Sequence, residues 1–105
     1  MKKLEKMFKY VNRELFGNML DTPYFFWIDP DQTLYAFMID GYCERHKGHY
    51  YIGITKDLTN TEMFDTMVHE MIHQHLMETK DYDGHGKPFK KMCRKAIEEF
   101  YWRTL

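Results

Sequence analysis

Cysteines, long apolar runs and an excess of one charge are all scarce in this sequence, and each shortage excludes a class of protein. The two cysteines, Cys43 and Cys93, stand far apart and form no Cys-x-x-Cys pair. A reduced intracellular protein is the simplest interpretation, with a disulfide between them as the alternative. No apolar run reaches the roughly 18 residues that a membrane-spanning helix needs, and no apolar stretch typical of a signal peptide follows the charged amino terminus. The sequence therefore predicts a cytoplasmic protein without a membrane segment.

The formal net charge is only −1, so the overall charge gives no reason to expect a nucleic-acid-binding protein. Hydrophobic residues make up 44% of the sequence and aromatic residues 17%, which argues against a disordered chain. A chain of 105 residues can bury one core, and we expect a single domain over residues 1–105. Cations near the amino terminus, such as Lys6, Lys9 and Arg13, are expected to form a solvated helix face.

Apolar side chains recur at helical spacing in three segments of the sequence. The first segment predicts a helix over Leu4–Phe16. The second predicts a helix over Asn60–Glu78, because Thr59 and Glu62 have the form of a capping box at its start. The third segment predicts a carboxy-terminal helix with Pro88 in its first turn.

Three runs of aromatic and aliphatic residues between the first two helices predict strands over Tyr24–Ile28, Leu34–Ile39 and Tyr50–Thr55. Arg45 and His46 are expected in the connection between the last two strands. We expect these strands to form a small antiparallel sheet. With an amino-terminal helix before it and two helices after it, the sequence predicts an α+β domain.

The strongest chemical signal is the pattern His-Glu-x-x-His at residues 69–73, in the middle of the predicted second helix. Residues four apart on a helix lie about 40° apart around its axis, so His69 and His73 project from one face and can converge on one metal ion. Glu70 lies about 100° from His69 and can act on a metal-bound water without being a ligand. This arrangement is typical of a zinc hydrolase, with Glu70 as general base. Asp65, one turn before His69, is expected to orient an imidazole or to be solvated.

A catalytic zinc usually has three protein ligands and an open position. His85 is the preferred third ligand, because Gly84 and Gly86 let the chain bend back over the motif helix. The less favoured alternatives are His46, His49, His75, Glu98 and Glu99.

The motifs together resemble the SprT-like metalloprotease domain of SprT and Spartan relatives. The resemblance rests on His-Glu-Met-Ile-His at 69–73, on Gly-His-Gly-Lys-Pro-Phe at 84–89 and on Val-Asn-Arg-Glu-Leu-Phe-Gly-Asn-Met-Leu at 11–20. The strand Tyr-Ile-Gly-Ile at 51–54 falls where that family has the strand before its motif helix. The resemblance covers nearly the whole chain, in the same order.

The resemblance implies a zincin-like metalloprotease fold with one zinc ion held by His69, His73 and His85 and with Glu70 as the base. It implies a protein or peptide as substrate, and DNA-associated proteins as one class of substrate, because eukaryotic relatives cleave proteins crosslinked to DNA. The sequence ends at Leu105 without the four-cysteine zinc ribbon of longer members, which puts dependence on DNA in doubt.

Two other functions compete with the protease interpretation. One is a non-catalytic module in which zinc only supports folding. The other is a DNA-binding module that uses the basic connection from Arg45 to His49 and the first helix. The presence of Glu70 favours the enzyme, because a purely structural zinc site needs no base and is usually closed by four ligands.

Overall fold

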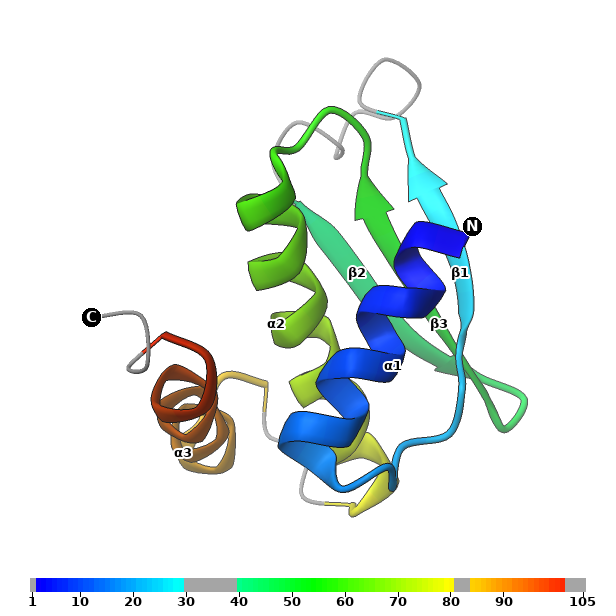
Figure 1. Cartoon of the computed structure of the whole chain (residues 1–105). Coiled ribbons are helices and arrows are strands. Elements are labelled where there is room, and N and C mark those ends of the chain that lie inside the picture. The colour runs from blue at the N-terminus through cyan, green and yellow to red at the C-terminus, as the bar shows by residue number, and fades with distance from the viewer. Residues whose placement is uncertain (1, 30–39, 81–83, 102–105) are drawn as a thin grey trace.

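The computed structural model describes residues 2–29, 40–80 and 84–101. In chain order the elements are α1 (Lys2–Phe16), β1 (Tyr24–Ile28), β2 (Gly41–His46), β3 (His49–Thr55), α2 (Asn60–Glu78), α3 (Lys87–Ala96) and the π-helical turn η1 (Ile97–Tyr101). Figure 1 shows α1 and α2 packed side by side against the sheet, with α3 next to α2. The predicted α+β class is therefore confirmed.

The sheet is mixed, with strand order β1-β3-β2, and the prediction of a purely antiparallel sheet is wrong. β2 and β3 form an antiparallel hairpin, but β1 pairs with β3 in parallel, with Tyr24 opposite Tyr51. A tight turn with positive φ at Lys47 (51°) and Gly48 (81°) reverses the chain between β2 and β3. The longer connection after β1 instead lets a parallel neighbour form, as parallel pairing requires.

The predicted strand over Leu34–Ile39 lies outside the described residues. β2 instead occupies a segment whose polar residues led to the prediction of a connection. Tyr42 and Glu44 are exposed while Cys43 between them is half-buried, which is the alternation of an edge strand with one solvated face. Arg45 thus belongs to a strand, and the polar character of this strand follows from its edge position.

Helix α2 begins and ends where the sequence predicts. The Thr59 hydroxyl accepts a hydrogen bond from the Glu62 backbone N–H at 3.1 Å, and the Glu62 carboxylate accepts one from the Thr59 N–H at 2.9 Å. Each side chain thus satisfies a backbone donor that the helix start leaves unpaired. The predicted capping box is confirmed.

The core lies between α1, α2 and the inner face of the sheet, with α2 at its centre. Met67, Met71 and Ile72 of α2 are almost completely buried. Gln74 is also fully buried, and its amide donates to the Asp21 carbonyl and to a Glu78 carboxylate oxygen, each at 2.7 Å. This pair of hydrogen bonds fixes the loop after α1 to the last turns of the motif helix.

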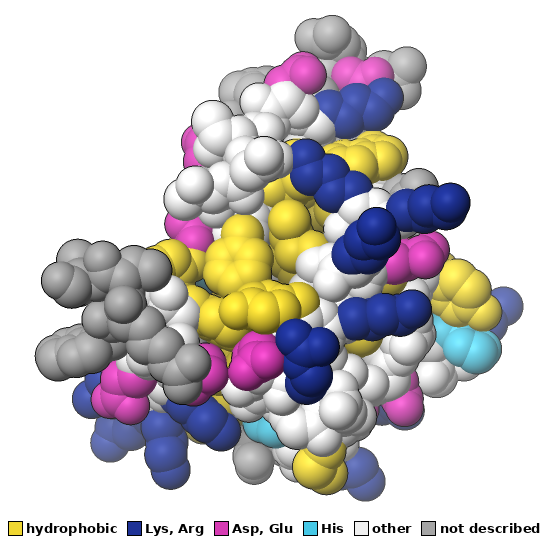
Figure 2. Space-filling model, in the orientation of Figure 1, with side chains coloured by type: hydrophobic (Ala, Val, Ile, Leu, Met, Phe, Trp, Pro, Cys, Tyr) yellow, Lys and Arg dark blue, Asp and Glu magenta, His cyan; other side chains and the backbone are white. Residues whose placement is uncertain are grey.

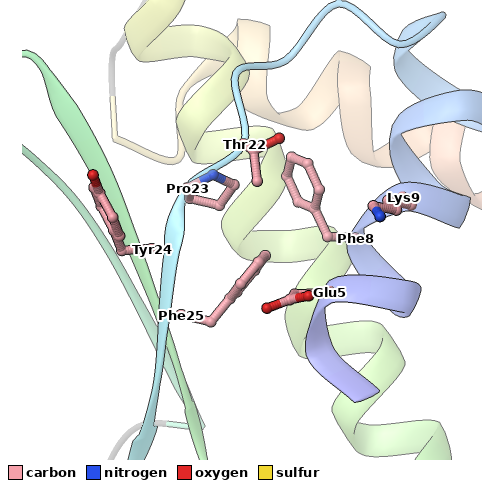
Figure 3. Close-up of a pocket in the computed structure, with 7 residues that line it drawn as sticks. All are labelled: Glu5, Phe8, Lys9, Thr22, Pro23, Tyr24 and Phe25. Atoms are coloured by element: carbon pink, nitrogen blue, oxygen red, sulfur yellow. The ribbon is translucent and has the colours of Figure 1, made fainter. Parts of the chain in front are cut away.

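A pocket of about 540 Å³ opens between α1 and β1. Phe8 of α1 and Phe25 of β1 meet edge to face in it, with ring centroids 5.6 Å apart (Figure 3). Its other lining residues are Glu5, Lys9, Thr22, Pro23 and Tyr24. Because no lining residue belongs to α2 or α3, this pocket is separate from the predicted metal ligands.

The cations of α1 are spread along the helix. Figure 2 shows Lys and Arg side chains along this face with acidic side chains among them. Lys6, Lys9 and Arg13 are accordingly exposed. Within the described ranges, no helix is long and apolar enough to cross a membrane.

The two cysteines are free, so the disulfide alternative is wrong. Cys43 points from β2 toward the helices and is half-buried. Burial, with the nearby carboxylates of Glu70 and Glu44, raises the pKa of its thiol to about 12. At neutral pH this cysteine is a protonated, apolar side chain.

Candidate metal centre

His69, His73 and His85 meet at one point on the surface of α2. The Nε2 atom of His73 lies 3.2 Å from that of His69 and 3.2 Å from that of His85, and the remaining separation, between His69 and His85, is 3.4 Å. The first two side chains come from successive turns of α2. His85 comes from the segment before α3, where Gly84 has a φ of 53° that favours glycine.

The triangle of nitrogens has the size that a tetrahedral metal site requires. Bonds of about 2.0–2.1 Å at tetrahedral angles place ligand atoms about 3.3–3.4 Å apart. The three measured edges, 3.2, 3.2 and 3.4 Å, fit that spacing. The predicted ligands His69, His73 and His85 can therefore hold one metal ion, and three ligands leave a fourth position open.

Burial and the neighbouring histidines keep the imidazoles of His69 and His73 neutral at neutral pH. Burial, followed by the charges of His69 and His85, lowers the pKa of His73 to about 4. Burial, followed by the charge of His85, also lowers the pKa of His69. A neutral imidazole offers a lone pair to a metal, whereas a protonated one does not, so both side chains can act as metal ligands at neutral pH.

Phe89 also belongs to the site, although the sequence indicates it only through the apolar spacing of the last helix and the motif at 84–89. Its ring centroid lies 4.9 Å from that of His69, 4.6 Å from that of His73 and 4.7 Å from that of His85. The ring is buried and nearly parallel to the imidazole of His73. By contacting all three imidazoles, Phe89 limits their rotation and holds His85 against α2. The signal available in the sequence was its position four residues after His85, one turn into the next helix.

Glu70 follows His69 on α2 and lies in a cavity of about 390 Å³ between α2 and β2 that His69 also lines. Its side chain is buried, and burial raises the pKa of its carboxyl to about 7. A carboxyl with a pKa near 7 is well matched to accept and release a proton at neutral pH. The carboxyl of Glu70 can therefore exchange a proton at neutral pH.

The raised pKa predicts how stability depends on pH in the metal-free protein. Because the pKa of Glu70 is about 7 when folded and 4.5 ordinarily, ionisation opposes folding, and stability is lost as the pH rises from 4.5 to 7. The Glu70→Gln variant lacks this loss, so its stability advantage over wild type should grow across this range, by at most about 3 kcal/mol. Urea unfolding of both metal-free proteins at pH 5 and pH 8 measures it. An advantage independent of pH would contradict the prediction.

Gly41 brings β2 into direct contact with α2. A Cβ atom at this position would lie 2.4 Å from Cγ2 of Thr66 and 3.1 Å from both Cγ and Oε2 of Glu70. The backbone of β2 can lie this close to Glu70 only because position 41 has no side chain. The sequence alone does not indicate this contact, because nothing local reveals a helix packed above Gly41.

Gly41→Ala is expected to lower the free energy of unfolding by about 1–3 kcal/mol, since the added methyl must push Thr66 away. The double variant Gly41→Ala with Thr66→Ser should recover part of that loss. Serine removes the clashing methyl and keeps the hydroxyl that donates to the Glu62 carbonyl at 2.7 Å. Urea unfolding of the single and double variants measures the effect. An Ala variant as stable as wild type would show that β2 can move away from α2 without cost.

The less favoured ligand candidates lie elsewhere. His75 packs against Phe16, and His49 packs against Tyr24. His46 pairs with His49 beside the turn of the hairpin. Among the described residues, the group of side chains close enough to share an ion consists of the three histidines and includes neither glutamate of η1.

Asp65 has a different partner from the imidazole that the sequence analysis considered. Its carboxylate accepts a hydrogen bond from the hydroxyl of Tyr101, at the end of η1. Burial raises the pKa of this carboxyl. The contact fastens the end of the chain's last described helix to α2, one turn before His69.

Comparison with known proteins adds one finding. The sequence model of the SprT-like family matches residues 4–103, and no curated protein matches the chain in sequence. SprT-like domains have a zincin-like fold, as the sequence predicted, here with three helices, a π-helical turn and a mixed sheet. The matched range includes His69, Glu70, His73 and His85. The chain belongs to the SprT-like family.

Proposed function

We propose that the protein is a zinc-dependent metallopeptidase that hydrolyses peptide bonds. The observation that carries the proposal is the triangle of Nε2 atoms, with edges of 3.2–3.4 Å, beside the buried carboxyl of Glu70. Membership of the SprT-like family supports a metallopeptidase-like domain.

Zinc is the ion that suits this donor set best. Three neutral imidazoles and one open position are typical of catalytic zinc, whereas magnesium and calcium prefer oxygen ligands. His69, His73 and His85 would hold the ion, which would lower the pKa of a bound water and polarise the carbonyl of the substrate.

Glu70 would take the proton from the attacking water and pass it to the departing amine. Its pKa of about 7 suits both transfers, because the carboxyl can be ionised in one step and protonated in the next at neutral pH. Gly41 of β2 and Thr66 of α2 line the cavity beside the base. Burial also keeps bulk water from solvating the carboxylate in competition with the reacting groups.

The substrate proposed is a protein or peptide rather than DNA. His85 is exposed and His69 half-buried, so a polypeptide can approach the centre from the surface. The formal net charge of −1 and the acidic side chains among the cations of α1 do not favour DNA as the substrate. Two free thiols fit the cytoplasmic location proposed for this activity.

Metal removal tests the proposal. A chelator should reduce hydrolysis of an unfolded protein substrate to the background rate, and one equivalent of zinc should restore it. The reason is that His69, His73 and His85 would contribute to the reaction only by holding the ion. Hydrolysis is measured by release of fluorescent fragments, and folding by circular dichroism in the same samples. Hydrolysis that continues after the metal is gone would refute the proposal. If zinc restored only the folded state and no substrate were cut, the non-catalytic module would be the better description.

A further inference from the structure

Besides the cavity that holds Glu70, another pocket borders His69, between α2 and the end of α3. Its volume is about 190 Å³, and the walls that matter here are Val68 and Ile72 from α2, and Ala96 and Ile97 from the end of α3 and the start of η1. Val68, Ile72 and Ala96 are buried, so the floor of the pocket is part of the hydrophobic core. The pocket is thus an apolar surface that continues the core outward.

His69 and Asp65 line this apolar pocket and also line the cavity that holds Glu70. The two cavities therefore meet at a metal ligand, with the base on one side and the apolar pocket on the other. A polypeptide whose reacting carbonyl lies at the metal would have its backbone at this meeting point. A side chain next to the reacting bond would then be within reach of the apolar pocket.

Size and polarity limit what the pocket can take. An apolar cavity of about 150 Å³ holds a benzene molecule, so about 190 Å³ accommodates the side chain of leucine, methionine or phenylalanine. A charged side chain would lose its hydration there, and Asp65 is the one carboxylate among the described lining residues. Asp65 at the rim is already engaged by the hydroxyl of Tyr101.

Ile97 extends the apolar surface at the edge of the pocket. This large apolar side chain is 49% exposed. It begins the π-helical turn η1, and such turns are frequent at functional sites. A substrate side chain in the pocket would cover Ile97 and remove this apolar surface from water.

We infer that this pocket binds an apolar side chain of the substrate next to the scissile bond, so that the protein cuts beside leucine, methionine or phenylalanine. The inference rests on the proposed peptidase function and adds the substrate class. Val68, Ile72, Ala96 and Ile97 determine the selectivity. Asp65 and Tyr101 border the pocket and set its depth toward the end of η1.

Two peptides that differ only in leucine or alanine at the position beside the cut test the inference. The wild-type protein should cleave the leucine peptide with a kcat/KM about 10- to 100-fold higher, as hydrophobic pockets discriminate between side chains of different size. Ile97→Trp, at an exposed position, should fill the pocket and bring the ratio close to one by slowing only the leucine peptide. Met19→Trp is the matched control, because Met19 is 80% exposed and does not line the pocket, and it should keep the wild-type ratio.

A second variant keeps the test informative if Ile97→Trp is unstable. Ile97→Ala enlarges the pocket and should shift the preference from leucine toward phenylalanine or tryptophan. Equal cleavage of both peptides by wild type, or an unchanged ratio in both Ile97 variants, would overturn the inference and leave the peptidase function standing. If the zinc-loaded protein cut no peptide of either kind, the peptidase function itself would fail, and the pocket inference with it.

Discussion

Replacing Glu70 with glutamine should lower the rate of peptide hydrolysis by about 10²–10⁴-fold, the usual contribution of a general base. Glutamine has nearly the same shape as glutamate and fits the same buried cavity, but it cannot accept a proton. The bound zinc should remain, because the proposed ligands are the three histidines and not this carboxylate. The turnover number and the zinc content of the same preparation measure both parts of the prediction.

Glu98→Gln is the matched control for this substitution. Glu98 was an alternative third ligand, and it is exposed on η1. Its substitution should change neither turnover nor zinc content. Full activity in Glu70→Gln would remove Glu70 from the mechanism. Loss of zinc from that variant would instead show that Glu70 contributes to binding the ion.

Replacing Phe89 with alanine should have the largest effect on stability, a loss of about 3–5 kcal/mol, typical of an aromatic ring removed from a core. Folded domains are stable by only about 5–15 kcal/mol, so a large share of the protein should unfold at low urea. Zinc affinity should also fall, by about 10- to 100-fold, the range seen when groups that orient metal ligands are lost. The ring touches all three imidazoles, so its removal leaves them free to rotate.

Two further variants separate the loss of stability from the loss of zinc affinity. Phe89→Leu keeps most of the buried apolar volume but cannot stack on His73, so it should lose zinc affinity with a smaller loss of stability. Phe100→Ala removes a half-buried ring that packs on Phe64 and Tyr10, away from the histidines. It should lose stability and keep zinc affinity. Urea unfolding and competition with a chromophoric chelator measure the two quantities. Wild-type zinc affinity in Phe89→Leu would show that the ring has no positioning role.

The parts of this molecule that the sequence predicts are those set by local interactions. The bounds of α2 follow from the capping box of Thr59 and Glu62 and from the apolar spacing of the helix, which act within a few residues. The convergence of His69 and His73 follows from helix geometry alone. The choice of His85 needed only that the chain bend back near Gly84, and the positive φ of Gly84 shows such a bend.

What the sequence could not predict depends on contacts between segments that are distant in the chain. The need for glycine at position 41 comes from Thr66 and Glu70, which lie above it on another element. The parallel pairing of β1 with β3 depends on which strands become neighbours, and strand periodicity gives no information on that. The contact of Phe89 with three imidazoles arises from the way α3 packs on α2, although its helical spacing correctly placed it on an apolar face.

The two strand pairings of the mixed sheet differ in the chain entropy that they cost. The β2–β3 hairpin closes a short loop at Lys47 and Gly48, whereas Tyr24 must find Tyr51 across all of the intervening chain. Closing that longer loop costs about 2 kcal/mol more in chain entropy. Parallel pairing is slightly less stable per residue than antiparallel pairing, and the packing of Phe25 on Phe8 of α1 adds to the pairing that holds β1. The packing of α1 on β1 thus helps to keep the third strand in the sheet.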